Sequence, residues 1–249
     1  MIVVVSGEGP SDIGNCATGE YGCIFPDFNI GPMTWLLDGL IEQAHGYSPL
    51  AATPGIYRYF SESAISERAQ ARKREKRYSL AGKKHGVETG YFYINAWMLA
   101  DIAKELEERE GDVSMAVLFR DTDGTNSSPR DIWERKYTSM LAGFERAEYE
   151  RGVPMMPRPK SEAWLLCAIK ENPYQGCAVL ETISGNDASP QSAKRMLDEA
   201  LEVSGSSENI CNWLSDNYFD YAAVADQMPS FYAFRERALH VLSQIRNAP

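Results

Sequence analysis

The stretches MIVVVSGEGPSD (residues 1–12) and MAVLFRDTDGT (residues 115–125) decide the fold. Each begins with an apolar run that ends at glycine or polar residues, which predicts a buried strand. Acidic residues follow each run. The carboxyl ends of parallel strands meet at one edge of a sheet, where such folds place their functional residues. We therefore expect Glu8, Asp12, Asp121 and Asp123 to converge on one point.

Four carboxylates that share a site repel one another unless a cation neutralises them. A hard divalent metal with oxygen ligands is the simplest neutralising partner. The sequence therefore predicts a site for Mg²⁺ (or Mn²⁺) at the ends of the two strands. The alternative is a pair of ordinary strand ends, with Glu8 on the surface and Asp121 and Asp123 in a turn closed by Gly124.

Strand and helix signals alternate up to about residue 170, which predicts an α/β core with helices on a mostly parallel sheet. The expected strands are 2–6, 55–60, 113–119 and 153–156. The expected helices are 34–43, 62–78, 93–109, 129–151, 189–203, 208–214 and 230–245, and a further helix begins near Lys160. The stretch from Asn15 to Pro32 is expected to be a loop. We expect a core over residues 1–170, with a basic helical insertion at about 61–84, and a helical region over 171–249 packed on it.

The composition of the 249 residues, 44% of them hydrophobic, is that of a globular chain with a sizeable core. We expect neither a membrane span nor a signal peptide, because the longest apolar runs are short and no basic segment precedes the first one. The five cysteines show no CxxC spacing. We expect them to be unpaired thiols in a reducing cytoplasm, rather than zinc ligands formed by Cys16, Cys23 and His45.

Charge is distributed unevenly along the chain. The formal net charge is −10, which argues against a protein that coats nucleic acid with its whole surface. Residues 68–84 nevertheless carry +7, which leaves −17 for the remainder. This basic arm predicts contact with a phosphate backbone, and the alternatives are an acidic protein partner or a solvated helix face. The candidate nucleic-acid contacts are Arg72, Lys73, Arg74, Lys76, Arg77, Lys83 and Lys84.

Two strings partly match familiar motifs. GEGPSD at residues 7–12 lacks the third glycine of a dinucleotide-binding loop, because Asp12 stands there and would repel a pyrophosphate. DTDGT at residues 121–125 resembles the first motif of the haloacid dehalogenase phosphatases, in which Asp121 would be the nucleophile and Asp123 the acid/base. No later strand of this chain ends in paired acids, so this interpretation is kept only as an alternative.

The EGPSD string at residues 8–12 and the DTD string at residues 121–123 together resemble the Toprim domain, which topoisomerases, primases and OLD-like nucleases share. The resemblance covers about residues 1–170 and implies a Toprim-like, Rossmann-like fold. It implies metal binding by Glu8, Asp121 and Asp123, with Asp12 as the fourth acid of the OLD-like branch. Lys160 is the best-placed equivalent of that branch's catalytic lysine. Glu162 and the PSFYAF string at residues 229–234 resemble features of small stand-alone Toprim proteins of phage defence.

The resemblance implies a Mg²⁺-dependent endonuclease that acts on DNA or RNA. Its catalytic residues would be Glu8, Asp121, Asp123 and Lys160, and its metal ligands would include Asp12 and Glu162. Carboxylate-held Mg²⁺ stabilises charge on the reacting phosphate and activates water, and a lysine stabilises the charge that develops. The alternatives are the phosphatase described above and a regulatory Toprim module that acts only with an ATPase partner.

Overall fold

The expected α/β architecture is confirmed. A computed structural model describes residues 1–74, 90–123, 129 and 131–247. Within them, a five-stranded sheet has the order β3-β5-β1-β6-β7, in which β3 is antiparallel to β5 and the other pairs are parallel. Its strands are β1 (Ile2–Gly7), β3 (Gly22–Ile24), β5 (Tyr57–Phe60), β6 (Ser114–Phe119) and β7 (Gly152–Met155).

Central strands β1 and β6 are buried along their whole length, which explains why their sequences are continuous apolar runs. Their register pairs Ile2 with Ser114 and Gly7 with Phe119. Both strands therefore end side by side. The acidic segments that follow leave the same edge of the sheet at neighbouring positions.

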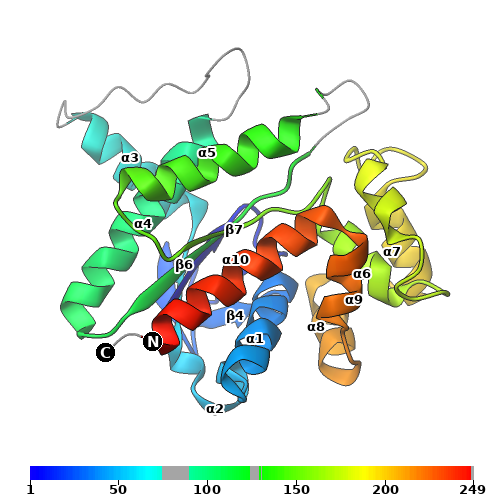
Figure 1. Cartoon of the computed structure of the whole chain (residues 1–249), viewed down its shortest axis with the longest axis horizontal. Coiled ribbons are helices and arrows are strands. Elements are labelled where there is room, and N and C mark those ends of the chain that lie inside the picture. Colours follow the sequence, from blue (N-terminus) through cyan, green and yellow to red (C-terminus); the bar gives the residue numbers. More distant parts are fainter. Residues whose placement is uncertain (75–89, 124–128, 130, 248–249) are drawn as a thin grey trace.

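Helices cover both faces of the sheet (Figure 1). Alternate residues of a strand point to opposite faces, so Val3 and Val5 enter one core while Ile2 and Val4 enter the other. The first core is covered by α1 (Pro32–His45), α6 (Ser161–Ile169) and α10 (Pro229–Arg246). The second is covered by α3 (Glu62–Arg74), α4 (Gly90–Glu110) and α5 (Ile132–Arg146).

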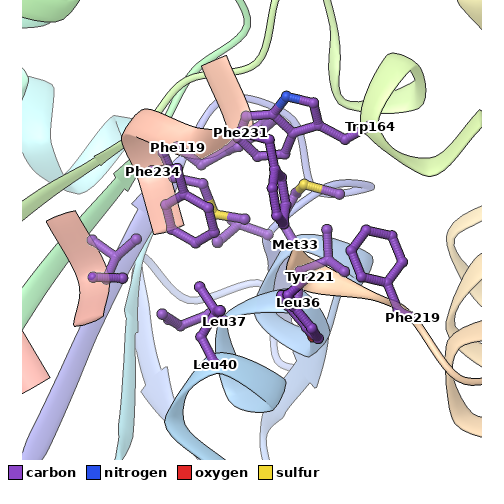
Figure 2. Packing of buried hydrophobic residues seen from close by; sticks show 14 of the residues in the cluster. Met33, Leu36, Leu37, Leu40, Phe119, Trp164, Phe219, Tyr221, Phe231 and Phe234 are labelled. Carbon is purple, nitrogen blue, oxygen red and sulfur yellow. The ribbon is translucent and has the colours of Figure 1, made fainter. Parts of the chain in front are cut away.

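The helical region beyond residue 170 shares the first core. Helix α10 packs on α1 and on the sheet, and Trp164 of α6 lies 5.0 Å from Phe231 and 5.6 Å from Phe234 between ring centroids (Figure 2). These three aromatic residues are therefore core residues. The remaining elements of this region are η2 (Cys177–Thr182), α7 (Ala193–Leu201), α8 (Ser207–Asp216) and α9 (Tyr221–Gln227). A short helix, α2 (Pro49–Ala52), and the 3₁₀ turn η1 (Pro54–Ile56) precede β5.

The prediction of a loop from Asn15 to Pro32 is wrong. This stretch contains most of the hairpin of β2 (Gly14–Cys16) and β4 (Phe28–Ile30), and also β3, which extends the main sheet. Gly14 has φ +118, and a Cβ there would lie 2.2 Å from the carbonyl oxygen of Asn29, so only glycine allows this pairing. Strands of three residues are too short to show a periodic pattern.

Several helix boundaries also differ. Helix α5 begins at Ile132 and ends at Arg146, whereas the expected helix ran from Pro129 to Arg151. Residue Gly152, expected as a helix stop, opens β7. Helix α3 is described to Arg74, so the rest of the expected basic helix lies outside the described residues.

The expectation of unpaired thiols is wrong for four of the five cysteines. Disulfides join Cys16 to Cys23 and Cys167 to Cys177, whereas Cys211 is free. The chain folds back between each pair, so partners 7 and 10 residues apart have Cα atoms 5.9 and 5.3 Å apart. The cysteines therefore give no support to a reducing compartment. Among the described helices, none is long and apolar enough to cross a membrane.

Candidate metal centre at the carboxyl edge of the sheet

The ends of β1 and β6 are joined by side-chain contacts of Glu8. Its Oε1 accepts a hydrogen bond from the backbone amide of Asp121 at 2.5 Å. Its Oε2 accepts one from Nη2 of Arg120 at 3.0 Å, and the same nitrogen contacts Glu62 Oε1 at 2.7 Å. Glu8 and Asp121, two of the four acids predicted to converge, are therefore direct neighbours.

The first residue of α6 connects two further acids. The Ser161 hydroxyl donates to Asp12 Oδ1 at 2.6 Å, and its backbone amide donates to Asp121 Oδ1 at 3.0 Å. The same hydroxyl lies 3.4 Å from Glu162 Oε2. The start of α6 thus brings Asp12, Asp121 and Glu162 together.

The backbone fixes Asp12 despite the hairpin that follows it. Its carbonyl oxygen accepts a hydrogen bond from the amide of Met33 in the first turn of α1, at 2.9 Å. Gly31 passes so close that a Cβ there would lie 2.3 Å from the same oxygen. After the hairpin the chain returns to contact Asp12, so the hairpin does not move this acid away from the site.

The DTD segment is bound to the segment before α6. The amides of Thr122 and Asp123 both donate to the carbonyl oxygen of Pro159, at 3.0 and 3.1 Å. Nζ of Lys160 lies 3.6 Å from Asp123 Oδ1 and 3.0 Å from Asp187 Oδ1. The predicted lysine is therefore next to the predicted metal-binding pair.

Electrostatics single out Asp121 as the centre of the cluster. Burial, with the carboxyls of Asp12, Glu162, Glu8 and Asp123 nearby, raises the pKa of Asp121 well above its ordinary value. Burial is also the main cause of the raised pKa values of Glu8, Asp12 and Glu162. Burial alone would lower the pKa of Lys160, but the carboxylates of Asp187 and Asp123 raise it above its ordinary value, so the ammonium stays charged.

The donor set fits a hard divalent cation. Within the described part of the chain, no three His, Cys, Asp or Glu side chains already stand in a metal-ligating arrangement. Burial and the repulsion of neighbouring carboxyls raise the pKa of Asp121, and a cation held by oxygen atoms would relieve that repulsion. Glu8, Asp121 and Asp123 are the residues that would hold it, with Asp12 and Glu162 at the edge.

Only some of the described basic residues of the arm are available to bind a ligand. Arg72 forms an ion pair with Asp101 and lies 5.3 Å from the centroid of the Trp97 ring, so it helps to pack α3 on α4. Lys73 and Arg74 are exposed. The other four candidate contacts, Lys76, Arg77, Lys83 and Lys84, lie outside the described residues.

Three residues of this edge were not predicted from the sequence: Arg120, Ser161 and Asp187. Arg120 directly precedes the DTD string and Ser161 directly follows Lys160, so adjacency to a motif was the available signal. Asp187 follows α6 by 18 positions in a segment without regular pattern, so the sequence carried no signal for it.

The chain matches no protein-family model, no curated protein and no solved structure.

Proposed function

We propose that this protein is a divalent-metal-dependent nuclease with a Toprim-like site. The observation that carries the proposal is the convergence of four acids from three separate segments on Asp121, with one lysine beside them. A purely structural strand edge has no reason to collect so many neighbouring carboxyls, because each raises the cost of ionising the others.

The proposed reaction is hydrolysis of a phosphodiester. A water oxygen bonds to phosphorus, the bond from phosphorus to the leaving oxygen breaks, and a proton passes from the water to that oxygen. The bound cation supplies an activated water and charge stabilisation. Lys160 would stabilise negative charge on the phosphoryl group, and Ser161 holds Asp121 and Asp12 in position.

The Toprim resemblance implies an effector of phage defence that acts on DNA or RNA. The same resemblance allows a module that cleaves only with an ATPase partner. Since these features rest on the motifs at residues 8–12 and 121–123 alone, they stay predictions.

The test compares cleavage and metal binding. Plasmid DNA, RNA and a generic phosphomonoester are incubated with Mn²⁺ and either the wild-type protein or Glu8→Gln, Asp121→Asn or Asp123→Asn. We expect Mn²⁺-dependent cleavage of a polynucleotide by the wild type and by none of these three variants. Glu110→Gln is the control, because Glu110 pairs with Arg58 outside the acidic cluster.

Thermal unfolding with and without Mn²⁺ completes the test, since a cation that binds only the folded state stabilises it by about 2.7 kcal/mol at 100 times its Kd. If Asp121→Asn removed only phosphomonoester hydrolysis, the phosphatase alternative would replace the nuclease. If Mn²⁺ stabilised the protein without any cleavage, the partner-dependent module would replace it. If neither cleavage nor stabilisation occurred, the metal site itself would be rejected.

A further inference from the structure

Arg120 places a nearly buried positive charge inside the acidic site. It follows β6 directly, and its side chain is only 12% exposed. A single nitrogen, Nη2, makes both of its ion pairs, one with Glu8 and one with Glu62. The guanidinium therefore already binds Oε2 of Glu8, an oxygen that would also be a ligand of the proposed metal ion.

The other guanidinium donors of Arg120 have no protein partner. Nε and Nη1 are buried, and neither has a hydrogen-bond partner among the residues that the structure describes. The guanidinium carbon lies 5.4 Å from the centroid of the Phe92 ring, and Nζ of Lys136 lies 4.9 Å from the same ring. A buried donor without an acceptor is unfavourable, so these atoms point to a ligand that supplies oxygen atoms.

A phosphate is the ligand that this chemistry favours. Guanidinium is a preferred partner of phosphoryl oxygens, because it stays charged and donates several hydrogen bonds from a planar group. The proposed substrate brings a phosphate to this edge of the sheet. A metal ion bound to Glu8 would also displace the positive charge of Arg120 from that carboxylate.

We propose that Arg120 is the resident counter-cation of the site and a phosphate ligand of the substrate. In the metal-free protein it neutralises Glu8. With a divalent cation held at Glu8, the guanidinium would bind a phosphoryl oxygen and stabilise the charge that develops on it. This assignment rests on the proposed nuclease function.

The experiment compares Arg120→Gln and Arg120→Lys with the wild-type chain. Isothermal titration with Mn²⁺ measures metal affinity, and cleavage of the polynucleotide substrate is measured at saturating Mn²⁺. For Arg120→Gln we expect Mn²⁺ to bind about tenfold tighter, because a competing charge is gone. We expect kcat to fall about 100- to 1,000-fold, because a donor to the transition state is removed. Arg120→Lys should keep the wild-type Mn²⁺ affinity and lose about tenfold in kcat, since an ammonium does not reproduce the planar donor set.

Arg58→Gln is the matched control, because Arg58 is also largely buried and forms one ion pair, with Glu110, away from the acids. It should change neither quantity. Circular dichroism establishes that each variant is folded. If Arg120→Gln does not fold, Arg120→Met replaces it in the Mn²⁺ titration, and Arg120→Lys decides the phosphate contact.

The proposal predicts that Arg120→Gln increases the affinity for Mn²⁺ and lowers kcat. Weaker or unchanged Mn²⁺ binding in a folded Arg120→Gln protein would overturn the counter-cation role. Unchanged kcat in Arg120→Gln, or in Arg120→Lys where only that variant folds, would overturn the phosphate contact. If the wild type itself did not cleave, the nuclease proposal would fail and take the phosphate contact with it, while the Mn²⁺ titration would still decide the counter-cation role.

Discussion

The Oδ1 atom of Asp121 accepts a hydrogen bond from the backbone amide of Ser161, at 3.0 Å and across 40 residues of chain. This bond joins the end of β6 to the first residue of α6. Two further bonds, from the amides of Thr122 and Asp123 to Pro159, reinforce the junction. The DTD motif and the segment that carries Lys160 therefore form one structural unit.

Asp121→Asn should separate the stability of the fold from its proposed chemistry. Asparagine keeps an oxygen for the Ser161 amide and removes a charge from a crowded, buried position. We expect the metal-free variant to be about 1–2 kcal/mol more stable than the wild type in urea unfolding. We expect its cleavage rate to fall at least about 100-fold, because a ligand of the proposed cation is removed.

Asp38→Asn is the contrasting control. Asp38 is more deeply buried than Asp121, and its carboxylate accepts hydrogen bonds from Ser48, Tyr57 and the amide of Leu50. Replacing this satisfied acceptor should destabilise the protein by about 1–3 kcal/mol. If both variants were destabilised alike, Asp121 would be an ordinary structural acid.

The metal-free protein should become more stable as the pH falls from neutral. The pKa values of Asp121, Glu8, Asp12 and Glu162 are raised in the folded state, mainly by burial. Such carboxyls bind their protons more tightly when folded, so the free energy of unfolding increases down to the ordinary carboxyl range and then levels off. Each unit of pKa difference contributes about 1.4 kcal/mol.

Urea unfolding at a series of pH values measures this effect. Asp121→Asn should flatten the dependence, and saturating Mn²⁺ should abolish it by compensating the charges. A free energy of unfolding that falls steadily on acidification of the wild type would contradict the assignment of raised pKa values.

The strand-end acids could be predicted because the signal is local. Strands β1 and β6 are central and buried on both faces, so each is a continuous apolar run, and the acids stand directly after it. Parallel pairing then places Glu8 and Asp121 at one edge. The contacts of Arg120 and Ser161 could not be predicted, because they depend on how a strand end meets a helix start far along the chain.

The hairpin after Asp12 and the pairing of the cysteines could not be predicted from the sequence. Strands of three residues have no period to detect, and disulfide connectivity depends on which segments the fold brings together. The sequence therefore suggested a loop and free thiols where the structure has β2, β3 and β4 and two disulfides.

Reduction should destabilise the protein without touching the acids directly. Each disulfide closes a short loop, Cys16–Cys23 after Asp12 and Cys167–Cys177 from α6, and such a loop contributes about 2.5–3 kcal/mol in the chain-entropy model. We expect a dithiol reductant to lower the unfolding midpoint. A Cys211→Ser variant should respond like the wild type, since Cys211 is free. An unchanged midpoint after complete reduction, verified by thiol titration, would contradict this contribution.

Lys160→Met should impair cleavage while leaving the fold intact. The ammonium lies between Asp123 and Asp187, at the edge of the acidic cluster. Losing its charge should lower kcat about 100- to 1,000-fold at saturating Mn²⁺. Asp187→Asn removes only one of the two partners and should stay within about tenfold of the wild type. A Lys160→Met protein with wild-type kcat would remove this lysine from the proposed mechanism.

The exposed part of the basic arm should bind nucleic acid, whereas Arg72 should stabilise the fold. Lys73 and Arg74 are exposed at the end of α3, and Arg72 is held by Asp101 and Trp97. Reversing both exposed charges with Lys73→Glu and Arg74→Glu should weaken binding of all sequences alike. It should also reduce the slope of log affinity against log salt concentration by about 0.7–0.9 for each phosphate that the protein no longer neutralises. Arg72→Ala should instead lower the unfolding midpoint.

The matched control reverses two exposed arginines at the opposite edge of the sheet. Arg109 lies in the last turn of α4, and Arg246 is the last residue of α10. Arg109→Glu with Arg246→Glu changes the net charge as much as the α3 reversals do, so it measures the general effect of added negative charge. A salt slope that falls equally in both double variants would show that α3 makes no local phosphate contact. A slope that falls only in the α3 variant would place the polynucleotide along that helix, because counterions are released where phosphates are neutralised.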